Sequence, residues 1–403
     1  MKKIKINRKY FGLDYILLYI NFLCLFFCAF GEHQRWNYPA SCVMLVNLFF
    51  YMILYGKIEL VKKTSVITKT LSIIWIMCVF SFANHVFYNK GLLSIFGKEF
   101  LSFQTFSYSM LWFISFYFSY VFSLRNNDWK IFRIIALLFF ICGCVYNLYT
   151  YNRIISVQDI YTNNAFYHIL IPLPLLFLNA NRRFRYLLLT IVFVLVLLSL
   201  KRSGMIIITS VIILTLFYDL FRNKNINIRD FLLTVLIVIF IVYFVQTKYE
   251  DRIGQITNRI ENISEDGGSG RDIIWRDAIS DIKSFDVAEF LLGKGFLSFN
   301  IAHPRLTTSH NDFIEILYSY GIIALLGYII FLIALLNNIF KLFKNRKDVF
   351  TSAMICFVCF LVFGLTSSMF AYQTLSGMLF SYVGVYEGLR NRNENILLML
   401  KSR

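Results

Sequence analysis

Residues 186–220 read YLLLTIVFVLVLLSL, then KRSG, then MIIITSVIILTLFYDL. Two apolar runs flank a turn that carries two adjacent cations, Lys201 and Arg202. Similar apolar runs recur along the chain, and about 20 apolar residues suffice for a helix to cross roughly 30 Å of hydrocarbon. Of the 403 residues, 58% are hydrophobic and 16% charged, whereas soluble domains carry about 25% charged residues. The pattern predicts an all-α polytopic membrane protein.

Twelve membrane spans fit the apolar runs, at about 11–30, 38–55, 71–88, 105–123, 131–150, 164–180, 186–200, 205–220, 231–246, 310–336, 350–370 and 376–388. Most lysines and arginines then fall in the loops of one side, which the positive-inside rule makes cytoplasmic together with both termini. The net charge of +17 is thus spread over short loops and does not indicate nucleic-acid binding.

These spans predict four parts of the chain. Residues 1–246 hold transmembrane helices 1–9, 247–309 form an outer loop with a helical cap, 310–388 hold helices 10–12, and 389–403 form a cytoplasmic tail. Within the loop, Ser269 is expected to cap a helix, with Asp272 three residues later. Ile274, Ala278 and Ile282 would share one face of that helix. Gly267, Gly268 and Gly270 before it, and Gly293 and Gly295 after it, are expected to be flexible joints.

The sequence Ser309-His310-Asn311-Asp312 stands where the outer loop meets the tenth span. A helix start explains Ser309 as the N-cap with Asp312 three residues on, but it leaves His310 and Asn311 unexplained. Glu315 follows one turn deeper, where a carboxylate in a span is costly, so we expect it to face the bundle interior and an arginine. Polar clusters of this kind in a membrane indicate catalysis or ligand binding.

Two other sites carry cations near the outer face. Lys201 and Arg202 could simply extend to the lipid headgroups, but a guanidinium also binds phosphate oxygens bidentately, which favours anion binding at Arg202. Gly270-Arg271-Asp272, followed by Trp275 and Arg276, would place cations at a helix N-terminus that favours anions. Taken alone, this common string is better explained as an ordinary solvated helix end. No Gly-rich nucleotide loop and no Asp-x-Asp pair stands in the loops, so we expect no cofactor and no metal. The eight cysteines, Cys356 and Cys359 included, are expected to pack helices.

At these residues the chain resembles the O-antigen ligase and polymerase superfamily. The matching pieces are Lys201-Arg202-Ser203-Gly204, Ser269-Gly270-Arg271 with Trp275, Gly293-Lys294-Gly295, Ser309-His310-Asn311-Asp312-Phe313, and Gly321 with Gly327. They cover about 190–335, and elsewhere only the number of spans and the hydropathy agree.

The resemblance implies a membrane-embedded, metal-independent, inverting glycosyltransferase of the outer face of the bacterial cytoplasmic membrane. Its donor would be an oligosaccharide on undecaprenyl diphosphate. By position, Arg202 and Arg271 would bind the diphosphate, and His310 would take the proton of the acceptor hydroxyl. Substrate contacts would come from Asn311, Asp312, Glu315, Lys201 and Arg276.

Three functions stay open at this point. A polymerase, the larger group and the favoured reading, would join repeat units of an O-antigen or capsule, whereas a ligase would transfer the glycan to lipid A core or another acceptor. A flippase for the same lipids would show two related halves and polar residues at mid-membrane, and the sequence shows neither. Candidate partners are the lipid-linked donor, the glycan acceptor, the bilayer, and flippase and chain-length regulator proteins.

Overall fold

The computed structural model describes residues 12–30, 34–55, 65–88, 107, 109–155, 164–199, 201–223, 267–296, 298–303, 308–345, 347–369 and 373–401. Within these ranges the regular structure is helical and no strand occurs, so the predicted all-α class is confirmed. The long helices are α1 (Leu13–Phe30), α2 (Gln34–Tyr55), α3 (Val66–Tyr88), α6 (Leu111–Arg125), α7 (Trp129–Ile155), α10 (Arg182–Ser199), α11 (Arg202–Asn223), α14 (Gly267–Lys283), α17 (Asp312–Asn345), α18 (Lys347–Thr366) and α19 (Gln373–Lys401). The short ones are η2 (Asn164–Phe166), α8 (Tyr167–Leu170), α9 (Leu173–Phe177), α15 (Val287–Leu292) and α16 (Ser298–Ala302).

Six described helices are long and apolar enough to cross a membrane. These stretches are Leu13–Phe30, Val66–Ala83, Trp129–Thr150, Arg202–Asp219, Asp312–Phe343 and Val349–Thr366. They support a membrane protein. They do not test the predicted number of twelve spans, and the span predicted at 231–246 lies outside the described residues.

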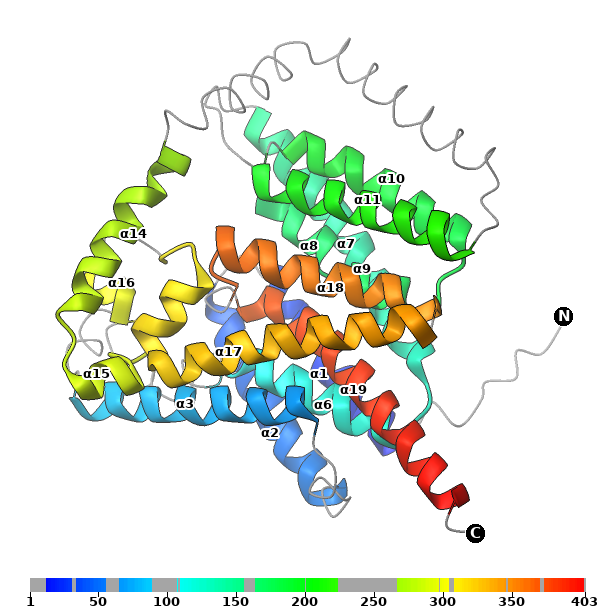
Figure 1. The fold of residues 1–403 in the computed structure, drawn as a ribbon, viewed down its shortest axis with the longest axis horizontal. Helices are drawn as coiled ribbons and strands as arrows, with labels where there is room; N and C mark the ends of the chain where they lie inside the picture. Colours follow the sequence, from blue (N-terminus) through cyan, green and yellow to red (C-terminus); the bar gives the residue numbers. More distant parts are fainter. Residues whose placement is uncertain are drawn as a thin grey trace, which may run out of the picture.

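The span predicted at 164–180 is divided into η2, α8 and α9. Pro172 and Pro174 lie at the division between α8 and α9, and neither has a backbone N–H to continue a helical ladder. This segment is buried in the bundle, where it packs against α7 and α18 (Figure 1). Irregular backbone at membrane depth is tolerated where protein surrounds it.

Helices α6 and α19 pack closely along their length. A Cβ added at Gly384 would lie 2.3 Å from the Phe116 carbonyl oxygen, so only glycine allows the two backbones to come so near. Helix α19 continues to Lys401, through most of the segment that the sequence analysis treated as a tail. Arg390 there forms an ion pair of 3.1 Å with the buried Glu387.

Helix α17 is interrupted at Gly321, which has φ 80° and ψ 177°. The interruption deprives preceding carbonyl groups of their usual helical donors. Two N–H groups from the loop after α15 take their place: Lys294 donates to the Tyr318 carbonyl at 2.9 Å, and Gly295 donates to the Ser319 carbonyl at 3.2 Å. The Ser81 hydroxyl of α3 also donates to the Ser319 carbonyl. The loop therefore completes the hydrogen bonding of the broken helix.

Two glycines make this contact possible. A Cβ on Gly321 would lie 2.2 Å from the Leu291 carbonyl oxygen, and one on Gly293 would lie 2.4 Å from the backbone of Ser319. Gly293 and Gly295 also have positive φ, 80° and 114°, a region that glycine adopts without strain. The sequence analysis expected flexible joints at these two glycines; the structure corrects this, because both are held by backbone contacts to α17.

Within residues 247–309, for which the sequence analysis predicted an outer loop with a helical cap, the described part forms the helices α14, α15 and α16 (Figure 1). Ala278, Phe299 and Tyr318 form its small core. Ile274 and Ile282 pack against that core together with Phe285 and Ile314. The predicted face Ile274, Ala278 and Ile282 is thus confirmed, and it attaches α14 to the N-terminal part of α17.

Two details of the predicted cap are wrong. Helix α14 begins at Gly267, so Ser269 lies inside it and is not its N-cap, and Gly267, Gly268 and Gly270 belong to its first turn and are not a flexible joint. Packing of an amphipathic face supplies most of a helix's stability in a folded protein. It outweighs here the low helix propensity of glycine, which amounts to about 1 kcal/mol per residue.

Two glycines of the same helix provide a matched test of the backbone contact. We expect Gly321→Ala to lower stability by at least about 1–3 kcal/mol, the usual cost of a residue held in a disfavoured backbone region, because its Cβ meets backbone atoms of Leu291. Gly327→Ala should cost clearly less, since its Cβ would meet the Ile74 side chain at 3.1 Å, which has to shift by only a few tenths of an ångström, and no backbone atom closer than 3.8 Å. Thermal unfolding of both detergent-purified variants measures the difference. Equal midpoints for the two variants would contradict the contact.

Candidate functional site

The segment Thr308–Asp312 leads from the cap into α17. Asn311 is the residue that caps this helix, because its Oδ1 accepts from the N–H groups of Phe313 at 2.9 Å and Ile314 at 3.2 Å. The predicted N-cap was Ser309, and this is wrong. The Ser309 hydroxyl instead donates to the Asn311 carbonyl at 2.9 Å, which stabilises the turn before the helix.

Glu315 is buried, as predicted, with 5% exposure. Its Oε2 accepts from the backbone N–H of Ser309 at 3.0 Å, whereas the sequence analysis expected an arginine as partner. The correction has a simple cause: the turn folds back over the first turn of α17 and brings a backbone donor to the carboxylate. Glu315 therefore fixes the position of the residue next to His310.

His310 has a left-handed backbone, with φ 53°. This region is uncommon for residues other than glycine, and such strain persists only where the surroundings enforce it, often at functional sites. The Thr308 hydroxyl supplies one restraint, since its Oγ1 accepts from the His310 N–H at 3.3 Å and lies 3.4 Å from Nδ1. The bonds of Ser309 and Asn311 supply the others. Hydrogen bonds of the residues before and after His310 therefore fix the turn that carries the imidazole.

Two cations act on His310. Burial lowers the pKa of His310 below its ordinary value of 6.5, and the positive charges of Arg271 and Lys201 lower it further. Arg271 comes from α14 of the cap, and Lys201 precedes α11. The charges of residues distant in the sequence therefore act on one imidazole, and they favour its neutral form at pH 7.

Three polar residues that the sequence analysis did not select complete this arrangement. The buried Tyr167 hydroxyl lies 2.5 Å from the Ser367 hydroxyl and within hydrogen-bonding reach of the Ser203 side chain, and the charge of Arg271 acts on it. We call Lys201, Arg271 and His310, with Tyr167, Ser203 and Ser367, the His310 cluster. Ser203 belonged to a quoted motif, but nothing in the sequence marks Tyr167 or Ser367 among many similar residues.

Trp275 attaches α14 to the turn that carries His310. Its indole N–H donates to the Ser309 carbonyl at 2.9 Å. Trp275 follows Arg271 by one helical turn. Its hydrogen bond therefore orients the part of α14 that carries this arginine. The Trp275 of the family motif therefore has a positioning role in this structure.

The remaining predicted site residues lie in different surroundings. Arg202 begins α11 and is partly exposed, between Lys201 and Ser203, which both belong to the His310 cluster. Asp312 is fully buried and accepts from the Tyr328 hydroxyl at 3.5 Å. Arg276 is not brought to the cluster: its side chain is 78% exposed and lies 4.0 Å from Asp272 of the same helix.

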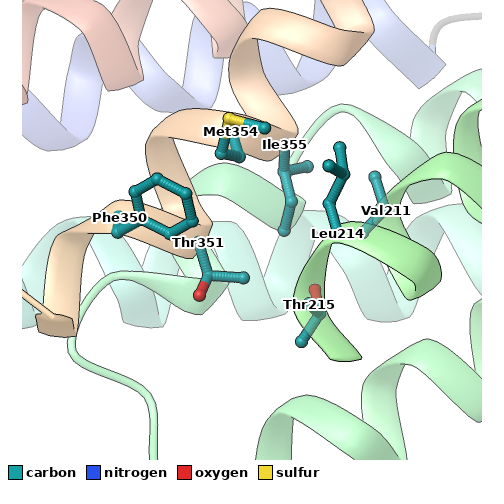
Figure 2. A pocket seen from close by; sticks show the side chains of 7 residues that line it. All are labelled: Val211, Leu214, Thr215, Phe350, Thr351, Met354 and Ile355. Carbon is teal, nitrogen blue, oxygen red and sulfur yellow. The ribbon is translucent and has the colours of Figure 1, made fainter. Parts of the chain in front are cut away.

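A small apolar pocket lies between α11 and α18 (Figure 2). It is lined by Val211, Leu214, Thr215, Phe350, Thr351, Met354 and Ile355. Arg185 fixes the position of Thr351 in this lining. It donates to the Thr351 hydroxyl at 2.9 Å and pairs with the buried Asp219 at 3.3 Å. The pocket is at the N-terminal end of α18, whereas Ser367 follows its C-terminal end.

Neither the cysteines nor the acidic residues indicate a metal centre in the part of the chain that the structure describes. No three His, Cys, Asp or Glu residues lie close enough there to hold an ion. Cys356 and Cys359 are free and buried in α18. They pack the helix bundle, as their apolar surroundings predict.

Comparison with known proteins gives one match. The family model described as O-Antigen ligase matches residues 186–329. This range contains Lys201, Ser203, Arg271 and His310 of the cluster, together with the glycines that join the cap to α17. No curated protein and no solved structure matches the chain. The resemblance to O-antigen ligases and polymerases predicted from the motifs is therefore confirmed over residues 186–329.

Proposed function

We propose that the protein is a glycosyltransferase that polymerises oligosaccharide repeat units carried on undecaprenyl diphosphate. The transfer inverts the anomeric centre, needs no metal, and takes place at the outer face of the bacterial cytoplasmic membrane. One observation carries the proposal: a half-buried histidine with a left-handed backbone favours its neutral form under the positive charges of Arg271 and Lys201.

His310 is the proposed general base. A neutral imidazole takes the proton of the acceptor hydroxyl while that oxygen forms its bond to the anomeric carbon of the donor. The bond between that carbon and the diphosphate oxygen breaks, and the diphosphate leaves with its electron pair. The left-handed backbone at His310 and the bonds of Thr308 fix the direction of the ring before substrate arrives.

The cations are the proposed binding site of the diphosphate. Negative charge grows on the leaving oxygen, and preorganised positive groups stabilise it most in a site from which water is excluded. Arg271 and Lys201 act on the same imidazole, so they are close to the reacting groups. Arg202, between Lys201 and Ser203, is assigned to the outer phosphate. The side chains of Asn311, Asp312 and Glu315 are buried, and they would orient the turn that carries His310.

The proposed topology has twelve spans with both termini in the cytoplasm. Residues 1–246, 310–388 and 389–403 would then be the first nine helices, the last three and a cytoplasmic end, and 247–309 the outer cap. The bias of basic residues supports this arrangement. It places the His310 cluster on the outer side, where a lipid-linked donor that has crossed the membrane, delivered by a flippase, would be found.

Ligation is the alternative, and the family match does not distinguish it from polymerisation. A polymerase and a ligase share the donor chemistry and differ in the acceptor, so the His310 cluster fits both. Polymerisation is preferred because polymerases form the larger group. Chain-length regulators would be partners only of a polymerase.

The direct test mixes purified protein with undecaprenyl-diphosphate-linked repeat units, without metal or nucleotide, and separates the glycans on a gel. We expect a ladder of regular steps. His310→Ala should reduce its formation about 10²–10⁴-fold, as expected for loss of a general base, and Arg271→Ala about 10²–10³-fold. Lys283→Ala, at the exposed end of the same helix, is the matched control and should retain activity.

Each other outcome has a definite meaning. New glycan only when lipid A core or another acceptor is supplied would establish the ligase. Movement of the lipid across vesicles without a new glycosidic bond would establish a transporter. Full activity of the His310→Ala and Arg271→Ala variants would contradict the proposed roles of His310 as general base and of Arg271 in binding the diphosphate.

The dependence of the rate on pH provides a second test. Because cations and burial lower the pKa of His310, the rate should fall only as the pH drops below about 6.5, where the imidazole becomes protonated. Lys201→Gln removes a charge that opposes protonation, so the pKa rises and the acid limb moves to higher pH. An acid limb that stays in place, or moves to lower pH, would contradict the proposed role of Lys201 beside His310.

A further inference from the structure

Helix α15 exposes apolar side chains although it belongs to the outer loop. Val287 is 77% exposed, and Phe290, Leu291 and Leu292 are 41–42% exposed. The helix has no buried residue. Four of the six residues of α15 are therefore large, apolar and exposed. Such a patch is unfavourable in water, and patches of this kind mark contacts with proteins or membranes.

The contact with α17 fixes the depth of this patch. Residues 322–340 contain no charged residue, and Lys341 follows them. Twenty residues from Gly321 to Lys341 span about 30 Å of helix, which equals the hydrocarbon thickness of a typical bilayer. Gly321 therefore lies at one boundary of the hydrocarbon when Lys341 lies at the other. Because the Leu291 carbonyl and Gly293 pack directly on Gly321, α15 lies at the same boundary.

The surroundings of α15 agree with that depth. It packs on α17 and contacts α3 (Figure 1). Both helices continue the apolar surface into their spans: Phe80 of α3 is 59% exposed and Leu326 of α17 is 52% exposed. Polar groups stand at the ends of α15, where Asp286 and Glu289 form a capping box and the Lys294 ammonium lies 4.5 Å from the Phe285 ring centroid.

We propose that α15 lies in the membrane interface, with Val287, Phe290, Leu291 and Leu292 in contact with phospholipid acyl chains. An apolar face below the headgroups with charged residues at their level is the arrangement of interfacial helices. The glycine contact then attaches the cap to α17 while the lipid contact holds it against the membrane. The cap that carries Arg271 is in this way kept at the depth of lipid headgroups.

Photocrosslinking of the full-length protein in vesicles of phosphatidylethanolamine and phosphatidylglycerol tests this contact. The photoreactive residue p-benzoylphenylalanine replaces Val287 or Phe290, whose exposed side chains leave room for the added benzoyl group. Leu326, exposed within a span, is the lipid control, and Asp277, exposed on α14, is the water control. After irradiation, mass spectrometry of the peptides measures phospholipid adducts. Positions 287 and 290 should give adducts close to the yield at 326 and several-fold above that at 277.

Adducts at 326 with none above the level of 277 at positions 287 and 290 would overturn the proposal. So would protein–protein adducts at 287 or 290, because they would show that a second copy of the chain covers α15. The measurement uses no glycan, so its result is independent of the proposed reaction.

Discussion

The backbone contact between the segment Leu291–Gly295 and the break in α17 at Gly321 is the constraint on which the site depends. A helix interrupted near a membrane leaves carbonyl groups that water cannot readily satisfy, and each unsatisfied group costs several kcal/mol. The N–H groups of Lys294 and Gly295 donate to the carbonyl groups of Tyr318 and Ser319, which precede this break. The broken helix therefore depends on the loop for its hydrogen bonds. Glycine at positions 293 and 321 allows the two backbones to come into contact.

From this contact the arrangement of the cap follows step by step. Tyr318, just before the break, is part of the small core that holds α14. Its hydroxyl also donates to Asp281 of α14 at 3.0 Å, and the imidazole of His303 lies 3.0 Å from the same carboxylate. Trp275, farther along α14, then bonds to the turn of His310. Arg271 is thereby carried to the imidazole by a rigid element and not by a loose loop, which is the condition for electrostatic preorganisation.

The sequence predicted the elements well and their interruptions poorly. Long apolar runs identified the helices because hydrophobic periodicity is a local signal, and the face Ile274, Ala278 and Ile282 was predicted for the same reason. The break at Gly321 depends on partners far along the chain, which no local pattern reveals. The division of 164–180 had a local signal in Pro172 and Pro174, which the prediction of a continuous span did not use. In the site, Lys201 stood out as a cation between two apolar runs and His310 as a polar residue at the start of another, whereas Arg271, in a polar loop, was selected through the family resemblance. Tyr167 and Ser367 did not stand out, because they matter only through their position in space.

Hydrogen exchange of two backbone amides, those of Lys294 and Gly295, tests the central claim most directly. The purified protein in lipid nanodiscs is exchanged into deuterated water, and the deuterium content is measured at single-residue resolution. Slow exchange at both amides, comparable with the amides inside α17, is the result that the structure predicts. Exchange at the rate of an exposed loop would show that the loop does not complete the broken helix, and the positioning of Arg271 beside His310 would lose its physical basis.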